Sequence, residues 1–220
     1  KLLPPTRDVN LKSDETGTPL QPAFTKAFEY SDCWVDDARL VVLNAMDARS
    51  RGAVIKTQTK VIKSEQIDGV WHVHTEDQQN GEQEIIQAKI LVNATGPWVD
   101  QYLGGAGGQP DVHNVRLVLG SHIIVEKMFD HDKCYIFQNV DGRIIFAIPY
   151  ENDFTMIGTT DLDYVGDPGE AEITEDEIEY LCTSASQYFK NPVARDQVIW
   201  QFCGVRPLFD DGASKAQEAT

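Results

Sequence analysis

The sequence lacks long apolar runs and is poor in positive charge. No stretch of 18 or more apolar residues occurs in the 220 residues, whereas a helix that spans a bilayer needs about 20. Lysine and arginine number 19 against 35 aspartates and glutamates, which gives a net charge of −16. Such a surface repels nucleic-acid phosphates and anionic lipid head groups. We therefore expect no membrane-spanning helix, no nucleic-acid partner and no electrostatic attachment of this chain to a membrane.

Cysteine is also scarce. The four cysteines form no CxxC pair and have no histidine at ligand spacing: Cys33, Cys134, Cys182 and Cys203. We therefore predict no metal site and interpret the cysteines as reduced, buried thiols of a cytoplasmic protein. The chain begins at Lys1 without an initiator methionine or a targeting segment and ends in a polar tail at 211–220. We expect an internal piece of a longer polypeptide.

The stretch KILVNATGPW, Lys89–Trp98, changes character abruptly. Ile90–Val92 is a short apolar run, typical of a strand that is covered on both faces in a parallel sheet. Small residues and Pro97 then require a turn with an almost bare backbone. In open α/β sheets, ligands bind at the carboxyl ends of strands, and small residues let a cofactor approach the main chain. An ordinary exit from a strand explains Ala94–Pro97 equally well.

The pattern of elements divides the chain into four segments. Residues 1–27 carry four of the ten prolines and are predicted to be an extended lead-in. Residues 28–110 combine a helix between strands with a three-stranded meander, which by fold analogy suggests a flavin-type nucleotide-binding domain. The expected elements are strands at 28–34, 54–59 and 90–92, a helix from Asp36 or Asp37 to Gly52, and hairpin turns at Asp68-Gly69 and Asn80-Gly81.

Residues 111–210 alternate polar and apolar residues in the manner of an antiparallel sheet. The sequence predicts one helix there, at about 174–190, because Thr174 and Glu177 have the spacing of a capping box before an apolar stripe. Expected strands lie at 115–119, 121–125, 135–139, 143–149, 154–159 and from 198 onward.

Arg206 stands out near the end of the last expected strand. It lies in the sequence Gly204-Val205-Arg206-Pro207, where glycine and proline restrict the backbone on either side. An arginine that is oriented in this way suits anion binding. A structural arginine that pairs with Asp210 or Asp211 is the alternative.

Five stretches resemble, in wording and in order, the FAD-dependent glycerol-3-phosphate dehydrogenases. They are YSDCWVDDARL (Tyr30–Leu40), VNATGPWV (Val92–Val99), LGSHIIV (Leu119–Val125), IGTTD (Ile157–Asp161) and GVRPL (Gly204–Leu208). The aerobic bacterial members look most similar, and those enzymes are peripheral inner-membrane proteins that pass electrons to quinone. The resemblance implies an α/β plus α+β chain: part of an FAD-binding domain with a β-meander, joined to an antiparallel-sheet substrate domain.

The resemblance also implies roles for particular residues. One segment lies by the flavin of FAD in this resemblance: Ala94, Thr95, Gly96, Pro97 and Trp98. A second segment lies near the adenine or pyrophosphate of FAD: Thr59, Lys60 and Val61. His122 and Arg206 match the histidine and arginine beside the flavin and the substrate. Arg206 would bind the phosphate or polarise the C2 hydroxyl. His122 would serve proton transfer, since an unperturbed histidine pKa is about 6.5.

The resemblance implies a reaction as well. It predicts oxidation of sn-glycerol 3-phosphate to dihydroxyacetone phosphate, with hydride transfer to FAD, in a cytoplasmic protein peripheral to the inner membrane. The GxGxxG segment that holds the FAD diphosphate is missing from these 220 residues, so we expect this chain by itself to be inactive and to bind FAD weakly or not at all. The alternatives are a glycerol-phosphate oxidase that uses oxygen and a non-catalytic module that retains the fold.

Overall fold

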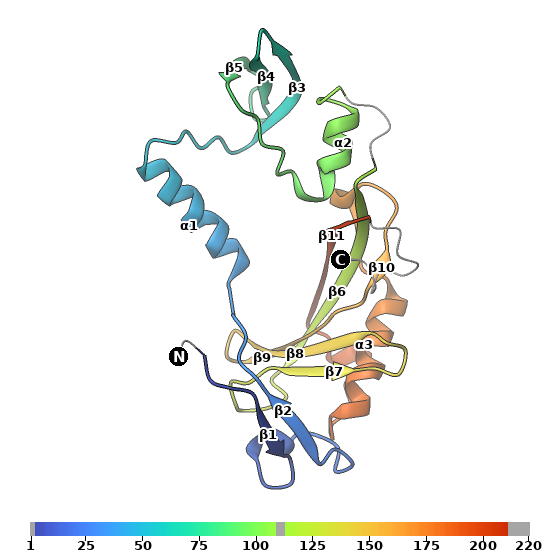
Figure 1. Ribbon diagram of the computed structural model, residues 1–220. Helices are drawn as coiled ribbons and strands as arrows, with labels where there is room; N and C mark the ends of the chain where they lie inside the picture. Colours follow the sequence, from blue (N-terminus) through green and yellow to red (C-terminus); the bar gives the residue numbers. More distant parts are fainter. Residues whose placement is uncertain (1–2, 109–112, 211–220) are drawn as a thin grey trace. The chain divides into compact units, whose positions relative to one another are not determined.

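The computed structural model describes residues 3–108 and 113–210 (Figure 1). These residues form two compact units. The meander unit comprises residues 3–5, 30–95 and 99–108, and the sheet unit comprises residues 6–29, 96–98 and 113–210. Every strand pair among the described residues is antiparallel.

The helix of the meander unit is α1, Asp37–Ser50. The Asp36 carboxylate accepts a hydrogen bond of 3.0 Å from the Arg39 amide, which satisfies a free N–H at the helix start. Gly52 follows the helix with φ +98°, a conformation that favours glycine. The predicted start and stop are therefore confirmed. The apolar residues of α1 are nevertheless not buried within the described chain.

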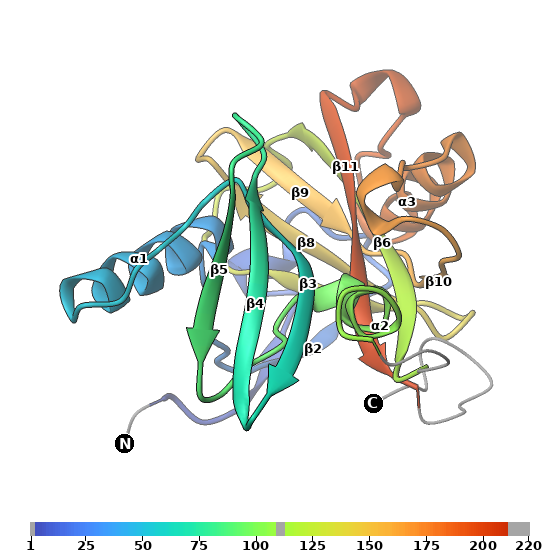
Figure 2. The same ribbon diagram turned by 90° about the horizontal axis from the view of Figure 1, so that it is seen from above.

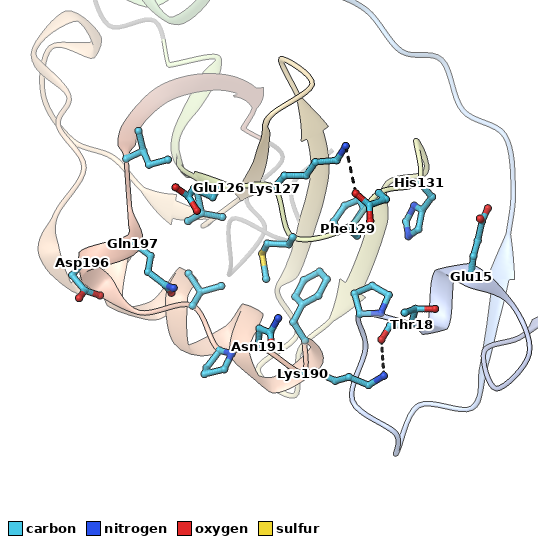
Figure 3. A pocket seen from close by; sticks show the side chains of 18 residues that line it. Glu15, Thr18, Glu126, Lys127, Phe129, His131, Lys190, Asn191, Asp196 and Gln197 are labelled. Carbon is cyan, nitrogen blue, oxygen red and sulfur yellow. Dashed lines mark hydrogen bonds and ion pairs between the residues drawn. The ribbon is translucent and has the colours of Figure 1, made fainter.

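A three-stranded sheet forms the rest of the meander unit. It consists of β3 (Thr59–Ile67), β4 (Val70–Asp77) and β5 (Gln83–Ala88), which lie side by side in Figure 2. Asp68 and Gly69 both have positive φ, as a two-residue hairpin of type I′ requires. The meander is confirmed, but the strand expected at 54–59 is wrong, because β3 begins only at Thr59.

The strand expected at 90–92 is also wrong. No described strand pairs with these residues, and Ile90 and Val92 are each 77% exposed. A strand covered on both faces needs hydrogen-bonded neighbours and layers above and below it, and the described residues supply neither. The turn that follows is present: the Asn93 side chain accepts from the Thr95 hydroxyl at 2.7 Å, and Gly96 has φ +57°. Two short helices continue the chain, η2 (Gly96–Trp98) and α2 (Val99–Gly104).

The sheet unit contains a six-stranded antiparallel sheet organised around β6, Val115–Glu126. On one edge β6 pairs with β11, Trp200–Phe209, along almost its whole length. On the other edge it pairs first with β10 (Leu162–Asp163) and then with β9 (Phe154–Gly158). Beyond β9 lie β8 (Ile144–Tyr150) and β7 (Tyr135–Gln138). The expected strands at 115–119 and 121–125 are thus one continuous strand.

One face of this sheet is covered by α3, Glu175–Tyr188, as Figure 1 shows. The capping box between Thr174 and Glu177 is present, so the predicted helix is confirmed. Ile178, Leu181 and Ala185 are fully buried in its apolar stripe. They belong to one core with five strand residues, which are Ile123, Val125, Ile145, Ala147 and Ile157.

The predicted extended lead-in is wrong in the part that the structure describes. Residues 7–29 contain two paired strands, β1 (Arg7–Asn10) and β2 (Lys26–Glu29), with the short helix η1 (Glu15–Gly17) between them. Val9, Leu11 and Leu20 join the core of the sheet unit, and Leu20 bridges to Phe189 just after α3. The four prolines lie outside the two strands, so they do not interrupt this pairing. The strand expected at 28–34 ends at Glu29.

Three further expectations concern cysteines, metal and membrane. Cys182 is buried, but Cys33 and Cys134 are exposed, so the expectation of buried thiols is wrong for these two. Across residues 3–108 and 113–210, no group of three potential metal-ligating side chains comes together. None of the described helices combines the length and apolar character of a bilayer span. The tail expected at 211–220 lies outside the described residues.

Candidate functional site

The strand register brings the two predicted catalytic residues onto one face of the sheet unit. On β6, His122 stands opposite Phe202 of β11 and Gly158 of β9. On β11, Arg206 stands opposite Val118. Side chains two and four residues apart on a strand share a face, so His122 and Arg206 point to the same side, with the Gly120–Gly204 pair between them. The buried neighbours of His122 on β6, Ser121 and Ile123, point to the face that α3 covers.

The His122 ring is held by its two cross-strand neighbours. It stacks on the Phe202 ring with 4.9 Å between centroids and an interplanar angle of 6°. It also lies directly over Gly158, where a Cβ atom would be 2.1 Å from His122 Cδ2. Contacts between carbon atoms are normally about 3.5–4.0 Å, so only glycine at 158 admits the ring in this position.

The electrostatic surroundings of His122 keep its imidazole neutral. Burial, and then the nearby Arg206 cation, lower the pKa of His122 to about 4. Its Nδ1 atom is buried and has no hydrogen-bond partner among the described residues. The assumption of an unperturbed pKa is therefore wrong, because desolvation disfavours the imidazolium. At neutral pH this histidine is an acceptor for a proton or a hydrogen bond.

Arg206 is held by the connection between β9 and β10. Its Nη2 atom contacts the Asp161 carboxylate and lies 3.4 Å from the Thr160 carbonyl oxygen. A Cβ atom at position 120 would lie 3.0 Å from that Nη2 and 2.7 Å from Thr159 Oγ1, so Gly120 leaves the space for both. The guanidinium is half-exposed, which leaves it able to bind an anion. The alternative interpretation, a structural arginine, expected Asp210 or Asp211 as the partner of Arg206, whereas the structure shows Asp161, which is distant in sequence. Asp211 lies outside the described residues.

A buried carboxylate lies behind this site. Glu177 of α3 is 4% exposed and accepts hydrogen bonds from the Ser121 and Thr160 hydroxyls at 2.7 and 2.9 Å. Thr160 Oγ1 in turn accepts from the Ser121 amide at 3.1 Å. The capping-box pattern indicated only the bonds of Glu177 within its own helix. Its bonds to the sheet join residues 17 and 56 positions apart in the chain, which no local pattern reveals.

The other predicted site residues fall into both units. Thr59, Lys60 and Val61 open β3 in the meander unit, and Ala94 and Thr95 belong to the same unit as exposed residues of the turn. Gly96, Pro97 and Trp98 belong to the sheet unit, where η2 packs against β11, the strand of Arg206. The Trp98 indole N–H donates to Asp167 at 3.2 Å. Within the sheet unit the structure thus brings Gly96–Trp98 next to the strand of Arg206.

The face that carries His122 and Arg206 is accessible around Gly204 and Phe202, where a planar ligand would have space. Gly120 and Gly204 face each other across β6 and β11, and a Cβ at position 204 would meet no atom within 4 Å. Phe202 adds a partly exposed ring, and the unpartnered Nδ1 of His122 adds a buried polar atom. A flat ring system with polar edges fits against such a surface.

The comparison with protein families identifies the class. The family described as "FAD dependent oxidoreductase" matches residues 4–219. The chain belongs to this family.

Individual relatives show which enzymes of this family the chain resembles. The chain is 46% identical over 220 residues to a D-erythritol 1-phosphate dehydrogenase from Brucella abortus (strain 2308), covering 100% of this chain and 44% of the relative. It is 43% identical over 201 residues to the aerobic glycerol-3-phosphate dehydrogenase of Escherichia coli (strain K12), covering 91% of this chain and 40% of the relative. The resemblance to glycerol-3-phosphate dehydrogenases is therefore confirmed. The chain spans less than half the length of these curated relatives.

A solved structure shares the fold. The glycerol-3-phosphate dehydrogenase from Bacillus halodurans, in complex with FAD, matches with a TM-score of 0.76 and 28% identity, over 94% of this chain and 45% of that chain. The predicted fold class, part of an FAD-binding protein with a meander and an antiparallel sheet, is confirmed.

Proposed function

We propose that this chain supplies the substrate face of an FAD-dependent dehydrogenase that oxidises sn-glycerol 3-phosphate to dihydroxyacetone phosphate. The observation that carries the proposal is the placement of a neutral, partly buried imidazole and a half-exposed guanidinium on one face of the same sheet, at His122 and Arg206. Oxidation of a secondary alcohol that carries a phosphate needs a proton acceptor and a cation, and this face offers both.

When bound, FAD would supply the acceptor for the hydride that leaves C2 of the substrate. The face around Gly204 and Phe202, together with Gly96–Trp98, would hold its ring system. For the meander unit, taken by itself, we propose Thr59–Val61 as contacts of the adenine or pyrophosphate part. The residues of this chain perform the remaining tasks. Arg206 neutralises the phosphate or the developing charge on the C2 oxygen, and a ring nitrogen of His122 accepts the hydroxyl proton.

The protonation state of His122 suits the acceptor role. A base must be unprotonated before the reaction, and a pKa of about 4 ensures this at neutral pH. A bound phosphate beside Arg206 would offset the guanidinium charge, which is the smaller of the two causes of the lowered pKa of His122.

D-erythritol 1-phosphate is the second candidate substrate. It is favoured by the 46% identity to a relative with that activity along the whole of this chain. Both compounds are polyol phosphates, so the roles of His122 and Arg206 stay the same. For either substrate we propose quinone as the final electron acceptor and a cytoplasmic location at the inner membrane, through parts outside this chain.

Steady-state oxidation by the full-length protein tests the function. We expect dye reduction with glycerol 3-phosphate, and the ratio of kcat/KM for the two substrates identifies the preferred one. Arg206→Ala should abolish most of the activity. Peroxide formation in air would indicate an oxidase that uses oxygen in place of quinone. A full-length protein that oxidises neither compound would support a non-catalytic module.

The isolated chain should bind FAD weakly or not at all. The reason is that the backbone amides of a GxGxxG turn, which carry much of the affinity for a dinucleotide diphosphate, are not encoded in these 220 residues. Titration of FAD into the purified 220-residue chain, followed by flavin fluorescence, measures this. A yellow stoichiometric complex would contradict the expectation.

A further inference from the structure

We propose that Glu177, on the α3 side of the sheet, is a positioning residue for Arg206 on the opposite side, and that it acts through the Thr160 hydroxyl. The inference rests on the proposed function, because Arg206 is the residue that binds substrate there. It assigns a second task to a carboxylate whose sequence context indicates only a helix cap.

The two oxygens of the Glu177 carboxylate have separate partners. Oε2 accepts from the Thr174 amide and hydroxyl, both at 3.0 Å, which closes the capping box. Oε1 accepts from the hydroxyls of Ser121 on β6 and of Thr160 in the connection between β9 and β10, at 2.7 and 2.9 Å. Burial acts to raise the pKa of Glu177, but these hydrogen bonds outweigh it and hold the pKa below its ordinary value. A buried carboxylate with only neutral donors is thereby kept ionised.

Thr160 occupies a gap in the strand pairing beside β6. The pairing with β9 ends at His122 opposite Gly158, and the pairing with β10 resumes at Leu119 opposite Leu162. In the gap, the Ser121 amide donates to Thr160 Oγ1 at 3.1 Å. The threonine hydroxyl therefore takes the place of a strand carbonyl, and its own proton goes to Glu177. Ser121 and Thr160 are both completely buried, so neither can exchange these bonds for water.

The segment locked in this way carries the groups that hold Arg206. The Thr160 carbonyl oxygen lies 3.4 Å from Arg206 Nη2, and the next residue, Asp161, contacts the same atom with its carboxylate. Thr159 Oγ1 donates to the Thr160 carbonyl at 2.9 Å and stands beside Gly120 on the guanidinium side. A shift of the Thr160 hydroxyl would move all three groups, because they belong to adjacent residues of one short connection.

A carboxylate is required at 177 rather than an amide. Four donors converge on its two oxygens, and a glutamine has one acceptor oxygen and an NH₂ group that is a donor. Glu177→Gln would place this NH₂ against the two hydroxyls or against the Thr174 amide. Either orientation breaks one half of the network while the size of the side chain stays almost unchanged.

The test compares the two halves of this network in the full-length enzyme. Thr160→Val removes the hydroxyl at nearly constant shape, Thr160→Ser keeps it, and Thr174→Ala removes only helix-cap bonds. We expect Thr160→Val to raise KM for the polyol phosphate, and the inhibition constant of inorganic phosphate, about five- to tenfold, the range of one hydrogen bond. Thr160→Ser should restore both constants, and Thr174→Ala should lower the Tm without changing either of them.

A second pair of variants covers the case in which Thr160→Val does not fold. Glu177→Gln should show the same rise in both constants. Its matched control is Glu175→Gln, the same change two residues earlier in α3, where the exposed carboxylate pairs with Arg195. Unchanged constants in Thr160→Val or Glu177→Gln would overturn the inference, and so would an equal rise in Thr174→Ala, because that would indicate a purely structural cap.

A readout that does not depend on turnover separates this inference from the proposed function. Phenylglyoxal labelling of Arg206, followed by peptide mass spectrometry, reports how firmly the guanidinium is held. We expect severalfold faster labelling in Glu177→Gln than in the wild type and no change in Glu175→Gln. An inactive wild type with this labelling pattern would refute the proposed function alone. Equal labelling in the wild type and Glu177→Gln would refute the inference.

Discussion

A single methyl group beneath His122 tests the site most directly. In Gly158→Ala, the new Cβ would lie 2.1 Å from His122 Cδ2 and 2.7 Å from both Cγ and Nε2. Normal separations are about 3.5–4.0 Å, so the ring must move by roughly 1.5 Å. Phe202, on the strand at the other side of β6, already stacks on the ring and restricts its movement. The imidazole must therefore rotate away from its present position.

The expected losses follow from that displacement. Overpacking of this kind costs about 1–3 kcal/mol of stability, and a misplacement of about 1 Å in a catalytic group costs on the order of 100-fold in rate. Thermal unfolding and kcat/KM for the polyol phosphate, both measured on the full-length enzyme, are the assays. The control is Gly104→Ala, because a Cβ there meets no atom within 4 Å. We expect it to change stability by less than about 1 kcal/mol.

Two outcomes would refute the reasoning about Gly158→Ala. Wild-type stability together with wild-type kcat/KM would mean that the ring does not occupy the position over Gly158. A clear loss of stability with unchanged kcat/KM at a permissive temperature would mean that the ring lies there but takes no part in the reaction.

Three further predictions follow from the same structure. Arg206→Lys keeps the charge but loses the planar fork, so KM for the polyol phosphate should rise about tenfold or more in steady-state kinetics, and an unchanged KM would argue against anion binding by Arg206. The folded-state pKa of His122, about 4, lies below the unfolded value of about 6.5. The unfolded chain therefore binds the proton first: stability is at its full value above pH 6.5 and falls as pH decreases toward 4, by up to about 3 kcal/mol. Denaturant titrations at several pH values should show this fall in the wild type and a smaller one in His122→Gln. Leu181→Ala empties a fully buried position and should cost about 2–5 kcal/mol in the same titrations, and a cost below 1 kcal/mol would place Leu181 outside the core.

Local signals predicted the elements that depend on few neighbours. α3 begins where Thr174 and Glu177 form their capping box, and β3 and β4 meet at Asp68-Gly69. In each case a few adjacent residues determine the backbone conformation. The strand predicted at 90–92 was wrong for the opposite reason. Its apolar residues indicate burial, but a central strand also needs partner strands that no local pattern specifies.

In the site, too, local sequence predicted some features, and others depend on residues that are distant in sequence. His122 and Arg206 were recognisable from the stretches that surround them, and the strand register explains why they share a face. The lowered pKa of His122 and the sheet contacts of Glu177 were not predictable, because both arise from residues brought together by the fold. Burial and hydrogen bonding across the sheet appear only once the register of β6, β9 and β11 is known.

The pairing of residues 19–21 with residues 188–190, at the end of α3, has a consequence for biosynthesis. The Gln21 amide donates to the Tyr188 carbonyl, and the Lys190 amide donates to the Pro19 carbonyl, at 2.7 and 2.8 Å. During synthesis, residues near 20 therefore lack these hydrogen-bond partners until about 170 further residues have been made. During that interval Val9, Leu11 and Leu20 have no final place to pack. Until α3 has been made, these three apolar residues therefore lack part of the core in which they finally lie.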